Sequence, residues 1–236
     1  MKAFLLAAGL GTRLKPLTDD TPKCLVSICG VPLIYIWLDL IEEAGIDEVL
    51  INTHYLADKV RDKVLSRNNK VKIKFFHEEV LLGSGNTIAL NYEFVKNEKN
   101  FFLLYADNLT NVSLKEILDY HLTLDSIFTT YVYETDIPKE KGIFTANDSG
   151  KVISFEEKPK NPESNLANSG IGVVNKKIFN YFNNNTYLDF GKDVMPKLMN
   201  HIYVLKTSKF IKDIGTMQDY YEAQSDWKKI NNSKKI

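Results

Sequence analysis

The sequence predicts an α/β protein with a three-layer, Rossmann-like fold, in which helices cover both faces of a doubly wound, mixed sheet. Short apolar runs alternate with amphipathic stretches through most of the first half of the chain, which is typical of βαβ units around a largely parallel sheet. Continuous apolar segments such as Phe101-Phe102-Leu103-Leu104 indicate strands that are buried on both faces. A sheet covered by helices on both sides satisfies both observations.

Strands and helices alternate regularly in the first half. The expected strands are at residues 2–8, 48–52, 72–77, 101–105 and 126–132. The expected helices between them are at residues 33–44, 56–66, 86–95 and 114–122. Gly45 is expected to end the first helix, because glycine readily adopts the conformation that closes a helix, and Ser113 is expected to cap the start of the last.

After about residue 135 the pattern changes to a smaller mixed lobe. Its expected strands are at residues 142–145, 152–155, 170–174, 203–206 and 209–213, and its expected helices lie near 176–183, 192–200 and 216–227. The polar, lysine-rich end at residues 228–236 is expected to fray. Nothing resembling a flexible linker separates the lobes, so we expect one fused domain over residues 1–227, with halves at 1–135 and 136–227.

Composition narrows the possible classes of protein. Thirty Lys and Arg residues balance thirty Asp and Glu residues, so the chain has no net charge to attract nucleic acid or an anionic membrane. The first apolar segment is too short for a membrane span and lacks a signal-peptide cleavage pattern, which favours a cytoplasmic protein. Cys24 and Cys29 have no partners at metal-ligand spacing, so we expect reduced thiols.

A glycine loop follows the first expected strand. The segment Gly9-Leu10-Gly11 has the form of a loop whose backbone N–H groups approach a phosphate closely. A Walker A loop would need Gly-Lys-Ser/Thr where Gly11-Thr12-Arg13 stands, and a dinucleotide fingerprint would need a small residue in place of Leu14. What remains is a loop with its own cation, Arg13, and a second cation, Lys23. Together they could neutralise a nucleoside triphosphate and its departing pyrophosphate.

Two motifs resemble a known family. This chain resembles the sugar-1-phosphate nucleotidyltransferases, which are also called nucleoside-diphosphate-sugar pyrophosphorylases. The segments similar to the family signature are Gly9-Leu10-Gly11-Thr12-Arg13-Leu14-Lys15-Pro16-Leu17-Thr18 and Thr21-Pro22-Lys23-Cys24-Leu25-Val26. The resemblance spans residues 1 to about 221 and implies an enzyme of EC 2.7.7 type with a nucleotide-diphospho-sugar transferase fold. The first half would bind the nucleotide, and the fused lobe would bind the sugar. The nucleotide-binding residues that it implies are Leu6, Ala8, Gly9, Gly11, Thr12, Arg13, Lys23, Gly83 and Ser84.

Two aspartates are candidate metal ligands. Asp107 ends a buried strand, and the ligands of an open α/β sheet collect at the carboxyl ends of its strands. Asp213 ends a second apolar strand and resembles the family's second metal-binding aspartate. The implied reaction brings two anionic phosphates together, so we expect Mg²⁺ at these carboxylates. Arg13, Lys23 and Asp107 are then the expected catalytic residues. Ala106 stands where the family usually has glycine, which leaves the choice of acceptor open.

The remaining motifs concern the base and the sugar. Leu82-Gly83-Ser84-Gly85-Asn86-Thr87 is similar to the family's glycine segment beside the nucleobase, although a helix-start loop capped by Ser84 or Asn86 is an equal alternative. Glu157-Lys158-Pro159 resembles the family's Glu-Lys-Pro element for the sugar phosphate, and Asn168-Ser169-Gly170 resembles a strand start that contacts the sugar. The sugar-phosphate residues implied by the resemblance are Asn108, Gly142, Glu157, Lys158 and Asn168.

The resemblance favours guanylyl transfer. The patterns at residues 105–108, 165–168 and 189–193 are most similar to mannose-1-phosphate and D-glycero-D-manno-heptose-1-phosphate guanylyltransferases, which implies GTP and a mannose- or mannoheptose-type 1-phosphate. Thymidylyl-, uridylyl- and cytidylyltransferases share the same frame. A non-catalytic nucleotide-sugar-binding regulatory subunit is the alternative from another class, and the presence of both cations and both aspartates favours the enzyme. A homodimer is compatible with a fold of this type.

Overall fold

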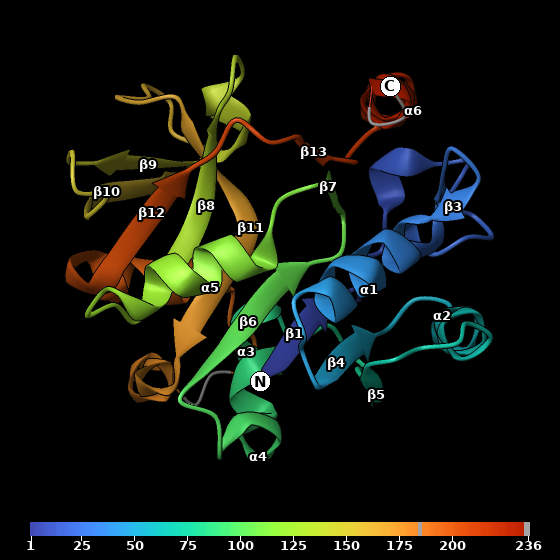
Figure 1. The fold of residues 1–236 in the computed structure, drawn as a ribbon, viewed down its shortest axis with the longest axis horizontal. Helices are drawn as coiled ribbons and strands as arrows, with labels where there is room; N and C mark the ends of the chain where they lie inside the picture. Colours follow the sequence, from blue (N-terminus) through green and yellow to red (C-terminus); the bar gives the residue numbers. More distant parts are fainter. Residues whose placement is uncertain (184–185, 234–236) are drawn as a thin grey trace.

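A computed structural model of the chain describes residues 1–183 and 186–233. Its centre is a nine-stranded mixed sheet, in which β10-β9-β11-β6-β1-β4-β5 forms the main path, while β8 pairs with β11 and with β12 (Figure 1). The strands of this sheet are β1 (Lys2–Leu6), β4 (Glu48–Thr53), β5 (Lys72–His77), β6 (Asn100–Tyr105), β8 (Phe128–Glu134), β9 (Gly142–Ala146), β10 (Val152–Glu157), β11 (Leu166–Asn175) and β12 (Ile202–Lys206).

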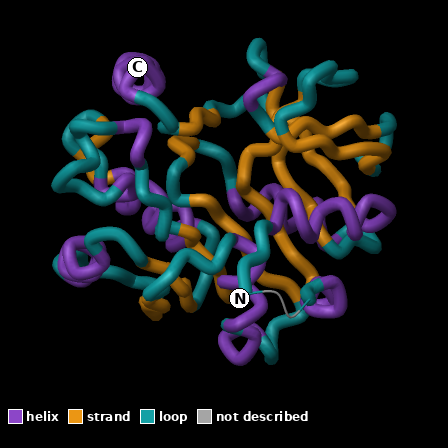
Figure 2. Tube along the Cα trace, turned by 180° about the vertical axis from the view of Figure 1, so that it is seen from behind, coloured by secondary structure: helices purple, strands orange, loops and turns teal. Residues whose placement is uncertain are grey.

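Helices pack against both faces of the sheet (Figures 1 and 2). The α-helices are α1 (Leu33–Glu43), α2 (Ala57–Leu65), α3 (Ser84–Leu90), α4 (Tyr92–Val95), α5 (Leu114–Leu122) and α6 (Met217–Ser233). Ala3 and Leu5 of β1 pack in a core with α1, α2 and α5, whereas Phe4 packs in a second core with α3 and α4. Alternate residues of a strand point to opposite faces, so one strand serves both cores. The predicted three-layer α/β fold is confirmed.

Strand direction decides where polar side chains gather. Strands β6, β1, β4 and β5 are parallel, so their carboxyl ends lie at one edge, and β11 runs antiparallel to β6. Past the end of β6, the short strand β7 (Asn108–Thr110) pairs antiparallel with β13 (Ile211–Asp213). Asp213 lies opposite Asn108 in this pairing. A residue near the C terminus is thereby brought to the edge of the sheet where β6 ends.

Several boundaries in the first half differ from the prediction. Strand β1 ends at Leu6 rather than at residue 8, because the Ala7 N–H donates to the Asn52 side chain at 2.6 Å. The helix predicted at 86–95 is two helices, because Asn91 adopts a non-helical conformation and its side-chain amide donates to the Thr87 carbonyl at 2.8 Å. Strand β8 begins at Phe128, two residues later than predicted, where its pairing with β12 begins.

The second half departs further from the prediction. The helix expected near 176–183 is a 3₁₀ helix at Lys176–Tyr181. The helix expected near 192–200 is a π-turn at Phe190–Val194 followed by a 3₁₀ helix at Met195–His201, where Pro196 cannot donate a backbone hydrogen bond. The end predicted to fray, residues 228–236, is helical through Ser233, where α6 ends, and residues 234–236 lie outside the described part. Once α6 is anchored, each added residue gains a helical hydrogen bond.

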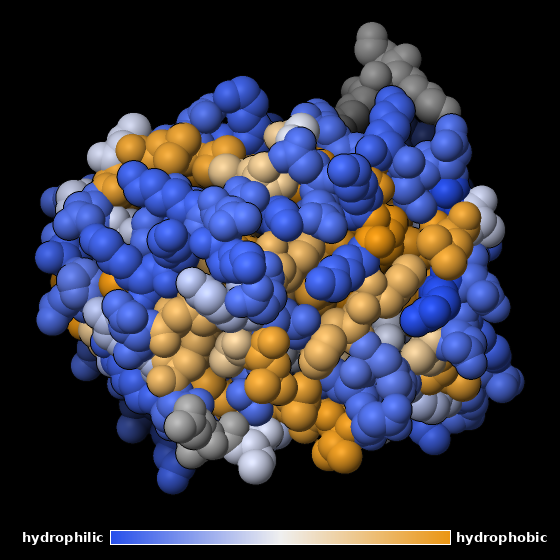
Figure 3. Space-filling model, turned by 90° about the horizontal axis from the view of Figure 1, so that it is seen from below, coloured by the Kyte–Doolittle hydropathy of each residue, from blue (hydrophilic) through white to orange (hydrophobic). Residues whose placement is uncertain are grey.

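The surface carries both polar and apolar residues. Figure 3 shows one face, on which hydrophilic residues are interspersed with separate hydrophobic patches. In the described ranges, 1–183 and 186–233, no helix has the length and apolar character needed to cross a membrane.

An ion-pair cluster joins α1 to the loop after α2. The Arg67 guanidinium donates to both carboxylate oxygens of Glu42, at 2.6 and 2.8 Å, and to Asp39 at 2.6 Å. Hydrogen bonds from Arg67 are the main cause that lowers the pKa of Glu42 from 4.5 to about 2. A carboxyl with a lowered folded-state pKa stabilises the fold above its unfolded pKa, and this contribution is lost as the pH falls toward 2.

We therefore expect Glu42→Gln to lower the free energy of unfolding by about 1–2 kcal/mol at pH 7. In urea denaturation at pH 3, the difference in the free energy of unfolding between variant and wild type should be smaller. At this pH the wild-type protein has already lost part of the stabilisation that the ionised Glu42 carboxyl provides. Asp39→Asn is the matched control, since Asp39 contacts the same guanidinium but its side chain is 68% exposed. An equal loss at both pH values, or an equal effect of Asp39→Asn, would contradict the assignment.

Candidate active site

Two adjoining pockets lie at the carboxyl edge of the parallel strands. The first, here the glycine pocket, has a volume of about 200 Å³, and the second, here the polar pocket, about 360 Å³. Tyr105 and Asp107 line both pockets, so the two pockets meet at the end of β6. Of the predicted residues, the glycine pocket is lined by Leu6, Ala8, Gly9, Lys23, Gly83, Ser84 and Asp107. The polar pocket is lined by Arg13, Asp107, Asn108, Gly142, Glu157, Lys158, Asn168 and Asp213.

The glycine loop is shaped by contacts within its own turn. Gly11 has a φ of 65° and precedes a 3₁₀ turn at Thr12–Leu14. Its carbonyl accepts a hydrogen bond from the Thr18 hydroxyl at 2.8 Å, and a Cβ on Gly11 would lie 3.0 Å from the Thr18 methyl carbon. Gly11 and Thr12 line neither of the two pockets, so they shape the loop, whereas Gly9 lies in the wall of the glycine pocket.

Lys23 joins the two predicted metal ligands. Its Nζ lies 2.8 Å from Asp107 Oδ2 and 3.4 Å from Asp213 Oδ1. Burial lowers the pKa of Lys23, but the two carboxylates outweigh burial and raise it above its ordinary value. Burial likewise raises the pKa of Asp213, but the ammonium groups of Lys23 and Lys141 outweigh it and lower this pKa. The pairing of β7 with β13 therefore converts two aspartates far apart in sequence into one cation-binding arrangement.

The donor set suits a magnesium ion shared with phosphates. Among the side chains that the structure describes, no group of three or more His, Cys, Asp or Glu residues could enclose a metal. Mg²⁺ rarely needs such a cage, because it is commonly held by one or two carboxylates together with water and phosphate oxygens. Asp107 and Asp213, which already converge on one ammonium group, fit this pattern.

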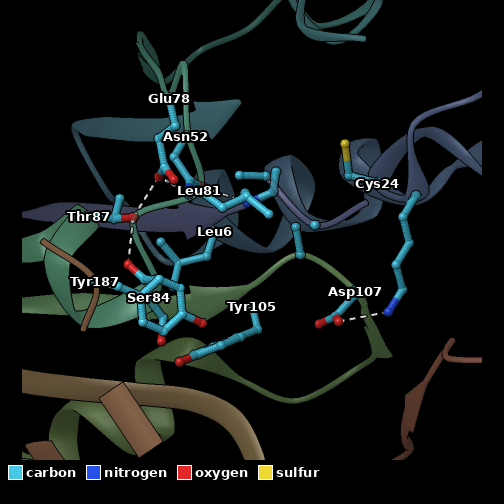
Figure 4. Close-up of a pocket in the computed structure, with 16 residues that line it drawn as sticks. Leu6, Cys24, Asn52, Glu78, Leu81, Ser84, Thr87, Tyr105, Asp107 and Tyr187 are labelled. Carbon is cyan, nitrogen blue, oxygen red and sulfur yellow. Dashed lines mark hydrogen bonds and ion pairs between the residues drawn. The ribbon is translucent and has the colours of Figure 1, made fainter. Parts of the chain in front are cut away.

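A buried carboxylate in the glycine pocket was missed by the sequence analysis. Glu78 is only 2% exposed, and its Oε1 accepts hydrogen bonds from Asn52 Nδ2 at 2.7 Å and Thr87 Oγ1 at 2.6 Å. Its Oε2 accepts one from the Leu82 backbone at 3.0 Å. Figure 4 shows Glu78 beside Asn52 and Thr87 in the wall of this pocket. Glu78 directly follows the strand predicted at residues 72–77. The rule that identified Asp107, polar residues beyond strand ends, could have found it.

The glycine segment packs against the second half of the chain. Leu188 accepts hydrogen bonds through its carbonyl from the backbones of Gly85 and Asn86, at 2.8 and 3.1 Å. A Cβ on Gly83 would lie 2.5 Å from this carbonyl oxygen, so the close approach requires glycine. Helix α3 begins at Ser84 and has no side-chain cap, so the alternative in which Ser84 or Asn86 caps the helix is wrong. The predicted cap of α5 is confirmed, because Ser113 accepts the Glu116 N–H at 3.2 Å.

The sugar-side motifs meet in the polar pocket. A Cβ on Gly142 would lie 2.7 Å from Glu157 Oε2, so glycine leaves room for this carboxylate. Asn168 Oδ1 accepts hydrogen bonds from Thr130 Oγ1 at 3.1 Å and from the Gly170 N–H at 3.2 Å, which orients its amide. Ala106, by contrast, is buried and lines the glycine pocket. Its methyl group therefore shapes the first pocket, rather than the second.

The layered sheet and its paired pockets define the class of the protein as a nucleotide-diphospho-sugar transferase fold. The solved structure of a putative glucose-1-phosphate thymidylyltransferase from Bacillus anthracis has this fold, with a TM-score of 0.86, 23% identity, and coverage of 95% of this chain and 94% of that one. The chain belongs to the nucleotidyl transferase family, whose model matches residues 2–230. The resemblance inferred from the glycine loop is thereby confirmed.

Two curated relatives and a further solved structure resemble this chain over almost its whole length. The chain is 29% identical to the bifunctional protein GlmU of Methanocaldococcus jannaschii, over 94% of this chain and 53% of the relative. It is 28% identical to a mannose-1-phosphate guanylyltransferase catalytic subunit beta of Drosophila melanogaster, over 93% and 60%. It thus spans little more than half the length of these curated relatives. HddC from Yersinia pseudotuberculosis, solved with GMP-PN, has a TM-score of 0.81 and 28% identity, with coverage of 96% and 99%.

Proposed function

We propose that the chain transfers a guanylyl group from GTP to a sugar 1-phosphate of the mannose or mannoheptose type. An oxygen of the sugar phosphate attacks the α-phosphorus, the new P–O bond forms, and the bond to pyrophosphate breaks. The observation that carries the proposal is the Lys23–Asp107–Asp213 cluster at the junction of two pockets, in a chain of the nucleotidyl transferase family. Such chemistry depends mainly on positioning and on charge stabilisation.

The two pockets suit the two substrates. The small glycine pocket, with the Gly9 loop and the Gly83 segment in its walls, would hold the base and direct the phosphates toward Lys23. The polar pocket would hold the sugar phosphate between Glu157, Lys158 and Asn168. Arg13 also lines the polar pocket and is exposed, so its guanidinium would reach the phosphates from that side. The sequence assigned Arg13 to the triphosphate alone, and we now propose that it contacts the phosphates from the side of the polar pocket.

Asp107 and Asp213 would hold Mg²⁺ in the loaded site. The ion would screen the charges of the two phosphates and orient them for in-line attack. Lys23 would then turn from the carboxylates toward the phosphates of the nucleotide, because the metal competes with its ammonium group for the same oxygens.

Glu78 supports guanine as the base. A carboxylate only accepts hydrogen bonds, and guanine presents two adjacent N–H donors on its Watson–Crick edge. Uracil and thymine present one N–H between two carbonyl oxygens, which a carboxylate would repel. Each carboxylate oxygen can accept two hydrogen bonds, and in the part of the chain that the structure describes Oε2 is bonded to the Leu82 backbone. Because Oε1 already accepts two hydrogen bonds, the second lone pair of Oε2 would accept one hydrogen bond, from either of the two adjacent donors of guanine.

Glu78→Gln is expected to lower kcat/KM for GTP by about 10–100-fold, because an amide donor would face the donors of guanine. The ratio of kcat/KM for GTP over UTP should fall, whereas a fold defect would lower both. Glu79→Gln is the matched control, since the adjacent Glu79 side chain is 91% exposed. An unchanged GTP/UTP ratio in Glu78→Gln would remove the basis for guanine recognition.

A pyrophosphate-release screen tests the function itself. The protein, with Mg²⁺, is incubated with each of GTP, ATP, UTP, CTP and dTTP and with mannose, mannoheptose or glucose 1-phosphate. We expect the fastest release from GTP with a mannose-type acceptor. Faster release with UTP or dTTP would contradict the base assignment. Absence of release from every pair would favour a non-catalytic nucleotide-sugar-binding subunit.

A further inference from the structure

The Asp213 carboxylate lies between two lysines that face different pockets. Lys23 Nζ lies 3.4 Å from Asp213 Oδ1, and Lys141 Nζ lies 3.3 Å from Asp213 Oδ2. Lys23 lines the glycine pocket, whereas Lys141 lines the polar pocket. Both ammonium side chains are largely buried, with exposures of 12% and 22%. One oxygen of this carboxylate therefore pairs with a lysine of the glycine pocket, and the other oxygen pairs with a lysine of the polar pocket.

The backbone of Lys141 is fixed at the wall of the polar pocket. Its carbonyl accepts a hydrogen bond from the Lys158 N–H at 3.0 Å, and Gly142, the next residue, packs closely against Glu157. The position of the Lys141 backbone is thus tied to the Glu157–Lys158 element. Its side chain has a flexible four-carbon stem, so the ammonium group can move several ångströms without movement of the backbone.

A divalent ion and two ammonium groups compete for the same carboxylate. Mg²⁺ at Asp107 and Asp213 would repel both ammonium groups, because like charges a few ångströms apart oppose each other strongly at a partly buried site. The released Lys141 side chain remains in the polar pocket, where the acceptor phosphate would lie. An ammonium group there would offset part of the repulsion between two phosphates that must approach each other.

We propose that Lys141 is an acceptor-phosphate ligand that exchanges Asp213 for the phosphate of the sugar 1-phosphate when a divalent ion occupies the aspartates. This proposal rests on the proposed function and adds a cation to the sugar side of the site. Lys141 transfers no proton, since the attacking phosphate oxygen is already anionic. It binds and orients the acceptor, and it keeps Asp213 paired until the metal arrives.

Equilibrium binding of mannose 1-phosphate is the first test. Calorimetric titrations in the presence of Mn²⁺ should show a Kd that rises about 10–100-fold in Lys141→Met, the effect of losing a charged hydrogen bond. The Kd for GTP in the same buffer should stay within about twofold, because Lys141 does not line the glycine pocket. Lys141→Arg should recover part of the affinity. Lys139→Met is the matched control, being an exposed lysine on the same turn.

Binding of Mn²⁺ without substrates is the second test. The direction in which Lys141→Met changes the Mn²⁺ affinity distinguishes a lysine that competes with the metal from one that only orients Asp213. If Lys141 competes with the metal, Lys141→Met should bind Mn²⁺ several-fold more tightly than wild type, because a competing cation is gone. If Lys141 merely orients Asp213, the variant should bind Mn²⁺ more weakly. Weaker Mn²⁺ binding, an unchanged Kd for mannose 1-phosphate, or no binding of this sugar phosphate by wild type would overturn the proposal. These titrations require no turnover, so failure of the pyrophosphate-release screen is a distinguishable result.

Discussion

Asp213→Asn is expected to lower kcat by at least about 10²–10³-fold, the cost of removing a major electrostatic contact with the transition state. An amide offers one neutral oxygen where the carboxylate offers two charged ones, so it binds a hard cation poorly. It would also leave Lys23 and Lys141 without a shared counter-charge. The Mg²⁺ concentration that gives half-maximal turnover should increase by about tenfold or more.

The measurement is a Mg²⁺ titration of pyrophosphate release by wild type and variant at saturating substrates. Thermal unfolding checks that β13 still pairs with β7, which positions residue 213. Asp226→Asn is the control, because Asp226 lies in α6 and pairs with Lys229 on the same helix. A wild-type Mg²⁺ titration in Asp213→Asn would show that the metal is held elsewhere.

Arg13→Ala is expected to lower kcat by about 10²–10³-fold with little change in folding. Arg13 is exposed, so its removal leaves no cavity. Its planar fork can contact two phosphate oxygens that gain negative charge as pyrophosphate departs. A smaller loss is expected in Arg13→Lys, which keeps the charge but not the fork.

Lys15→Ala provides the comparison for Arg13, since Lys15 lies in the same loop and forms an exposed pair with Asp19. Steady-state kcat, KM for both substrates and the Tm should be measured for each variant. Wild-type-like turnover in Arg13→Ala would exclude a transition-state role. Equal losses in Arg13→Ala and Lys15→Ala would indicate that only the net charge of the loop matters.

The sequence was most informative where structure depends on neighbours in the chain. The strand at 72–77 and the helix at 114–122 match the structure at both ends, because hydrophobic periodicity and the Ser113 cap are local signals. The glycine loop, Lys23 and the two aspartates were also identifiable, since family motifs are local runs. The helices predicted near 176–183 and 192–200 were wrong in type, because segments of five to seven residues are too short for apolar spacing to distinguish α from 3₁₀ or π geometry.

Contacts between distant residues account for what the sequence did not reveal. Glu78 is a polar residue after a strand, but its burial depends on Asn52 from β4 and Thr87 from α3. Lys141 resembles any surface lysine until β13 places Asp213 within 3.3 Å of it. Neither the partner nor the burial of such a side chain follows from its local sequence.

The sequence by itself determined the class of fold, the family, and the phosphate-directed loop with its cations. Only the tertiary structure decided that Asp107 and Asp213 converge on Lys23, that Glu78 lines the glycine pocket, and that Asp213 separates two lysines. The physical reason is that charge and hydrogen-bonding interactions act over a few ångströms in space. Sequence motifs record which groups are available, and the pairing of β7 with β13 brings residues about a hundred positions apart into that range.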